Sequence, residues 1–114
     1  MTNYLLNNTK GRHIAFRGVK LSSVTSDPDP SFNPPHRSRM SVYRTEAGKY
    51  VSMVVNLTGD KETRCVSTVF DSAEELLRKY EKPGGGFGHL SYRVLTEAAE
   101  QDDAIKLAMT HHVS

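Results

Sequence analysis

Three strand-like segments follow one another in the middle of the chain: Arg39-Met-Ser-Val-Tyr-Arg-Thr45, Tyr50-Val-Ser-Met-Val-Val-Asn-Leu57 and Arg64-Cys-Val-Ser-Thr-Val-Phe70. Alternating, β-branched segments of this length are typical of strands. The segments are joined by Glu46-Ala-Gly-Lys49 and Thr58-Gly-Asp-Lys61, in which the glycines suit tight hairpin turns. The pattern therefore predicts a three-stranded antiparallel meander.

Helical patterns occupy the residues after this meander. Asp71 and Ser72 each have a glutamate three residues later, which is the spacing of a capping box, so one of them is expected to begin a first helix. A second helix is expected from about Leu90, and a third after a cap at Asp102 or Asp103. Apolar residues recur at helical spacing in all three segments, which predicts that the helices lie against the sheet.

The residues before the meander predict a hairpin and a long loop. The runs 3–6 and 13–16 flank an Asn/Gly cluster, and the second run extends to Leu21, with Gly18 as a candidate bulge. Residues 22–38 hold four of the five prolines, which excludes a helix or a central strand there. This loop is either mobile or draped over the sheet, and Phe32 either pins it or is exposed to a partner.

Together these patterns predict one α+β domain over residues 1–114. The sheet is expected to have four or five mostly antiparallel strands, an N-terminal hairpin plus the meander, with two or three C-terminal helices on one face. Successive side chains of a strand point to opposite faces of the sheet. This alternation, which we call strand parity, predicts Met40 and Val42 on the buried side, together with the odd-numbered residues from Val51 to Leu57. Tyr43 and Tyr50 are then expected together on the other face.

The composition favours a soluble protein with a thin core. Hydrophobic residues make up 37% of the chain, so a homodimer that covers a further apolar face is one expectation. Cys65 is the single cysteine, which excludes an intramolecular disulfide and suits a reducing compartment. No apolar run reaches the length of a signal peptide or a membrane span. We therefore expect a cytoplasmic protein.

No pattern in the sequence indicates catalysis, a metal site or a cofactor, so an enzyme is not expected. The five histidines lack the spacing of a zinc site, and Cys65 has no partner nearby in sequence. The glycine-rich segment 84–88 follows a predicted helix rather than a strand, unlike a phosphate-binding loop. It is interpreted as a flexible linker, with anion binding as the alternative.

The charges are unevenly distributed along the chain. Residues 1–70 carry ten Lys/Arg and five Asp/Glu, a balance of +5, and residues 71–114 have a balance of −3. The first hypothesis is a small non-catalytic interaction protein, such as an inhibitor, immunity or accessory factor, that binds a protein partner. The alternative is a nucleic-acid-binding module with cations and stacking rings on its sheet face. The candidate binding residues are Arg12, Arg17, Phe32, Arg37, Arg39, Tyr43, Arg44 and Tyr50.

Overall fold

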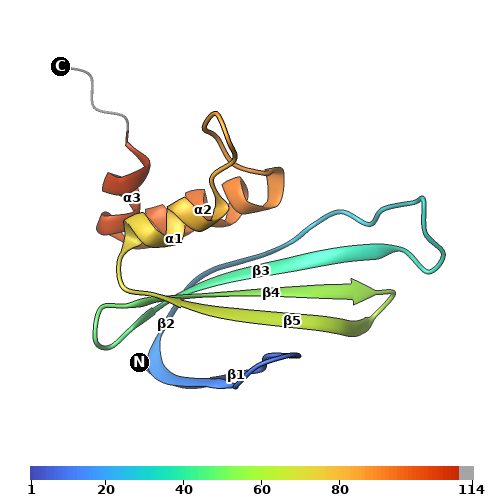
Figure 1. Cartoon of the computed structure of the whole chain (residues 1–114), viewed down its shortest axis with the longest axis horizontal. Helices are drawn as coiled ribbons and strands as arrows, with labels where there is room; N and C mark the ends of the chain where they lie inside the picture. The colour runs from blue at the N-terminus through green and yellow to red at the C-terminus, as the bar shows by residue number, and fades with distance from the viewer. Residues whose placement is uncertain (111–114) are drawn as a thin grey trace.

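The computed structural model describes residues 1–110 and contains one sheet of five antiparallel strands (Figure 1). The strands follow each other in space in their sequence order. They are β1 (Thr2–Leu6), β2 (Ile14–Thr25), β3 (His36–Thr45), β4 (Tyr50–Thr58) and β5 (Lys61–Phe70). The predicted α+β class, the hairpin and the meander are confirmed.

Three helices cover one face of the sheet, as Figure 1 shows. They are α1 (Ala73–Tyr80), α2 (His89–Gln101) and α3 (Asp103–Met109). Ser72 caps α1 by accepting a hydrogen bond from the Glu75 amide at 3.2 Å, and Asp102 caps α3. Both alternatives at the predicted caps are thereby resolved. Within the described residues, no helix is long and apolar enough to cross a membrane.

The main core lies between the helices and the sheet. The helices contribute fully buried side chains to it, and β2, β3, β4 and β5 each contribute side chains of one face. Burial of this apolar surface is the main force that holds the two layers together. The buried members of this core are Leu21, Val24, Met40, Val42, Tyr50, Phe70, Ala73, Leu76, Leu77, Val94, Leu95, Ala98 and Ile105.

The second face of the sheet is also buried, which corrects the predicted side-chain parity. Met40 pairs with Val54 and Tyr43 pairs with Val51, so Met40 and Val51 lie on opposite faces. Met40 faces the helices, whereas Val51 belongs to a separate apolar cluster. The expectation that both lie on one buried side was wrong because both faces of β3 and β4 are covered.

The hairpin of β1 and β2 covers the second face. β1 and the start of β2 lie on the side of the sheet away from the helices (Figure 1). Tyr4, Leu6 and Phe16 pack there against Tyr43 and Val51, and the Tyr4 and Tyr43 ring centroids are 4.9 Å apart. The sheet therefore curls over itself like an incomplete barrel.

Hydrogen bonds join the tip of this hairpin to β5. The Thr9 amide donates to the Cys65 carbonyl at 2.8 Å, and the Cys65 amide donates to the Thr9 hydroxyl at 2.7 Å. The Asn8 side chain donates to the Ser67 carbonyl and accepts from the Ser67 amide. These contacts close the curled sheet at one point along β5.

The predicted bulge and loop differ in their positions from the expectation. The ladder of β2 and β3 shifts between Lys20 and Ser22, not at Gly18. The proline-rich loop is shorter than predicted, since residues 22–25 belong to β2 and residues 36–38 to β3. The connection between them is draped beside the end of the sheet. Its backbone bonds run from the Ser26 amide to Ser38, from the Asp29 amide to His36, and from the Gly59 amide to Pro35.

Candidate functional site

The structure does not gather the predicted arginines on one surface. The strand register places Arg37 and Arg39 on the face of Val55, whereas Arg44 lies opposite Tyr50 on the helix side. An acidic side chain neutralises each of the three. The pairs are Arg37–Asp60 at 3.6 Å, Arg39–Glu62 at 2.9 Å and Arg44–Asp102 at 2.8 Å.

The two predicted tyrosines do not form an open stacking face. Tyr43 is 2% exposed and Tyr50 is 4% exposed. Tyr43 packs under the β1–β2 hairpin, whereas Tyr50 packs under the helices. The expectation that they share a solvated face was wrong because the two tyrosines lie on opposite faces of the sheet, and both faces are covered there.

The remaining candidates lie at different places on the surface. Arg12 is exposed at the tip of the hairpin, and Arg17 is exposed on β2. Phe32 is half-exposed and stacks on His36 with ring centroids 3.9 Å apart. Arg17 lies near one end of β3 and Phe32 beyond the other end, which are about 30 Å apart for a strand of this length. Arg17 and Phe32 therefore cannot contact one small ligand.

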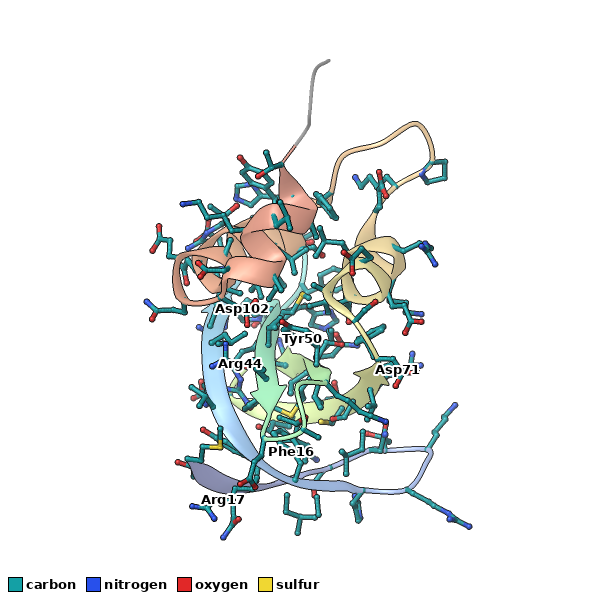
Figure 2. The ribbon with its side chains drawn as sticks, turned by 90° about the vertical axis from the view of Figure 1, so that its left-hand side faces the viewer. Phe16, Arg17, Arg44, Tyr50, Asp71 and Asp102 are labelled. Carbon is teal, nitrogen blue, oxygen red and sulfur yellow. The ribbon has the colours of Figure 1, made fainter. Side chains whose placement is uncertain are left out.

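A buried polar network accounts for Arg44 and Tyr50. The Asp102 carboxylate accepts from the Arg44 guanidinium at 2.8 Å, from the Tyr50 hydroxyl at 3.0 Å and from the Ile105 amide at 3.0 Å. Figure 2 shows the three side chains close together between the sheet and the helices. The network fastens α3 to the sheet.

The network changes the pKa values of its members. Burial, followed by the hydrogen bond to Asp102, raises the pKa of Tyr50 to about 12. Burial alone would raise the pKa of Asp102, but hydrogen bonds from Ile105, Arg44 and Tyr50 outweigh it and lower that pKa. The tyrosine is therefore neutral and the carboxylate ionised over the ordinary pH range.

We expect the stability of the protein to fall as the pH rises from about 10 to about 12. The folded state holds the Tyr50 proton more tightly than the unfolded chain, so this contribution is complete below the unfolded pKa of about 10. Burial also raises the pKa values of Tyr43 and Tyr80, which add to the effect. Urea unfolding at several pH values should show that the free energy of unfolding falls less steeply with rising pH for Tyr50→Phe than for the wild type. An equal slope in both would contradict the role given to Tyr50.

A polar hollow of about 570 Å³ lies at the end of the sheet that carries the proline-rich connection. Asp27, Asp29, His36 and Asn56 are among its lining residues. Asp29 already accepts a hydrogen bond from the Ser31 amide. Across residues 1–110, no group of three or more His, Cys, Asp or Glu side chains could hold a metal ion. The described residues of the hollow therefore do not form a set of metal ligands.

The glycine-rich segment forms a tight turn between α1 and α2. The Lys82 amide donates to the Gly86 carbonyl at 2.8 Å, and a bridge joins Glu81 to Phe87. Gly84, Gly85 and Gly86 all have positive φ angles, which only glycine adopts readily. The glycines are therefore explained by the backbone of the turn, whether or not an anion binds there.

An apolar pocket of about 470 Å³ lies where the curled sheet fails to close. We call it the side opening. Its apolar lining comes from the start of β2, from the turn between β3 and β4, from β4 and from β5. Arg17, Glu46 and Lys49 lie among its polar lining residues. In Figure 2 Phe16 lies toward the body of the sheet and Arg17 at the margin of the hairpin. The apolar residues of the side opening are Ile14, Ala15, Phe16, Ala47, Val51 and Val69.

Unpaired backbone borders the side opening on two sides. The backbone amides and carbonyls of Cys65 and Ser67 point away from β4, toward the hairpin tip. Every second residue of a strand directs its backbone groups the same way, so the amide and carbonyl of Val69 also point away from β4. On β2, the Arg17 carbonyl accepts a hydrogen bond from the Glu46 amide, so the backbone groups of Arg17 point away from β1. The same alternation directs the amide and carbonyl of Ala15, two residues earlier, away from β1. Within the part of the chain that the structure describes, no residue outside the paired strands bonds to these groups.

Only part of the side opening was found from the sequence. Arg17 was a candidate binding residue, Val51 was predicted on the buried side of the sheet, and Phe16 was placed only in the predicted hairpin. The alternation in the segment 64–70 does not decide which face of the sheet Val69 occupies. The sequence did indicate that this strand is covered on both sides. The segment from Tyr50 to Leu57 has apolar residues at odd and at even positions, which is typical of a strand buried on both faces.

Comparison with known proteins identifies no relative: no family model, no curated protein and no solved structure matches the chain.

Proposed function

We propose that the protein is a non-catalytic binding module that captures a protein partner at the side opening. The observation that carries this proposal is a solvent-accessible apolar pocket between two strand edges with unpaired backbone. Val69 is 46% exposed at this place, although its neighbour on the same face, Ser67, is buried. An apolar side chain of a partner that enters the pocket would gain burial, and its backbone would gain hydrogen-bond partners.

The alternative, a nucleic-acid interface, receives less support from the geometry. Three of the candidate arginines already pair with acids, and the rings of Tyr43 and Tyr50 are buried. Single-stranded nucleic acid is usually held by exposed rings beside free cations. The lone thiol of Cys65, which is free and buried, supports the cytoplasmic location that belongs to the same proposal.

The substitution Val69→Asp tests the proposal, and Val66→Asp is its matched control. Both residues lie on β5 with similar exposure, 46% and 38%, but Val66 faces the other side of the sheet, outside the side opening. Co-purification from the native host first identifies a protein that the wild type retains. Titration of that purified partner should then give about 30-fold weaker binding for Val69→Asp, the effect of losing one hot-spot contact.

The control variant should bind the partner as the wild type does, and both variants should melt within a few degrees of it. Equal affinity of the two variants for the partner would refute binding at the side opening. A partner that proves to be RNA or DNA, with affinity that falls steeply with salt, would favour the alternative. Sedimentation of the wild type separates a second copy of the chain from another protein as the occupant.

A further inference from the structure

The hairpin beside the side opening is cationic and contains no acid. Residues 1–26 hold Lys10, Arg12, Arg17 and Lys20, and they include no Asp or Glu. All four side chains are exposed, and none forms an ion pair with a described residue. At the opposite rim, Lys49 pairs with Asp71 at 3.2 Å, and Glu46 is the one acidic residue of the lining. The hairpin that forms one side of the pocket, with Arg17 in the lining, therefore favours a segment of negative charge.

The free edge of β5 favours an extended segment. Two residues before Val69, the side-chain amide of Asn8 pairs with both the amide and the carbonyl of Ser67, as a neighbouring strand would. The next outward pair of groups, at Val69, has no such partner among residues 1–110. A helix satisfies its own backbone groups and leaves such an edge unpaired, whereas an added strand bonds to it.

An added strand would also match the arrangement of side chains at the side opening. Successive side chains of a strand point to opposite sides. One apolar side chain would then enter the pocket toward Phe16 and Val51, and its neighbours would point outward, where Arg17 is exposed. A carboxylate at such a neighbouring position could accept a charge-assisted hydrogen bond from the guanidinium.

We infer that the segment captured at the side opening is an extended, acidic stretch of the partner, which adds a strand to β5 at Val69, inserts one apolar side chain and pairs with Arg17. This inference rests on the proposed function, and it adds the conformation and the charge of the bound segment. The bound segment would contact Arg17 on β2 and Val69 on β5, two residues that lie more than fifty positions apart in sequence.

A phage-displayed library of random peptides tests the inference. Selection on the wild-type protein, with removal of phage that bind the Val69→Asp variant, should enrich peptides in which apolar residues alternate with Asp or Glu. A synthetic copy of the most enriched peptide should bind about tenfold more weakly to Arg17→Ala, and N-methylation of its backbone beside the apolar anchor should weaken binding as strongly. Arg37→Ala, at the other end of the sheet, is the matched control and should leave the affinity unchanged.

Three results would overturn the inference: no enrichment, enriched peptides with apolar residues at helical spacing, or N-methylation without effect. These outcomes differ from a failure of the proposed function. If the native partner still loses affinity for Val69→Asp while the selected peptides are helical, the side opening binds a protein but not as an added strand. If Val69→Asp leaves native binding unchanged, the site itself is wrong.

Discussion

Replacing Asp102 by Ala should lower the free energy of unfolding by about 3 kcal/mol, or the melting temperature by on the order of 15 °C. The carboxylate caps α3 and is nearly inaccessible, and it accepts from both Arg44 and Tyr50. The truncation removes the cap, and it leaves the Tyr50 hydroxyl buried without its acceptor. The Arg44 side chain is partly exposed and can reach water, which limits the loss.

Two further variants define the cause of this loss. Asp102→Asn keeps an oxygen for the cap but removes the charge, so it should be intermediate in stability. Asp103→Ala changes the adjacent acid, which is exposed, and should cost less than about 0.5 kcal/mol. Chemical denaturation of the three variants measures these differences. An Asp102→Ala protein as stable as Asp103→Ala would contradict the structural role of the network.

Replacing Gly18 by Ala should cost about 3 kcal/mol or more, because β2 and β3 approach closely there. A Cβ atom on Gly18 would lie 2.2 Å from the Arg44 carbonyl oxygen, a backbone atom that cannot move without disturbing the ladder. The displaced strand also carries Arg44 away from Asp102. Loss of that contact adds to the cost.

Gly11→Ala is the matched control for this substitution. At Gly11 the nearest atom to an added Cβ is 3.7 Å away, in the side chain of Asn8, which is ordinary contact. Thermal melting should therefore separate the two alanine variants by many degrees. Similar melting temperatures would mean that the two strands are not as close at Gly18 as described.

The local patterns in the sequence predicted most of the elements, because each depends on residues close together in the chain. Alternation defined the strands, and the acids beside Ser72 and Asp102 marked two helix starts. The curl of the sheet could not be predicted this way. It depends on hydrogen bonds between Asn8 and Ser67, 59 residues apart, and on a hairpin that covers a face which parity alone leaves open.

The candidate site could be predicted only in part for the same reason. Arginines were chosen because their charge suits many ligands, but the acids that neutralise Arg39 and Arg44 lie 23 and 58 residues away in sequence. The side opening is an interruption between β2 and β5, and no short motif marks it. The alternation of Val69 with its neighbours became interpretable only through its pairing with Val51.

Hydrogen exchange at the Val69 amide tests the central claim most directly, namely that the gap between β2 and β5 is a binding site. In the free protein this amide should exchange rapidly, whereas the Cys65 amide, bonded to Thr9, should be protected. The partner to use is the protein that binds Val69→Asp more weakly than Val66→Asp. A saturating amount of it should slow exchange at the Val69 amide. Protection of Val69 in the free protein, or rapid exchange that the bound partner leaves unchanged, would contradict the account.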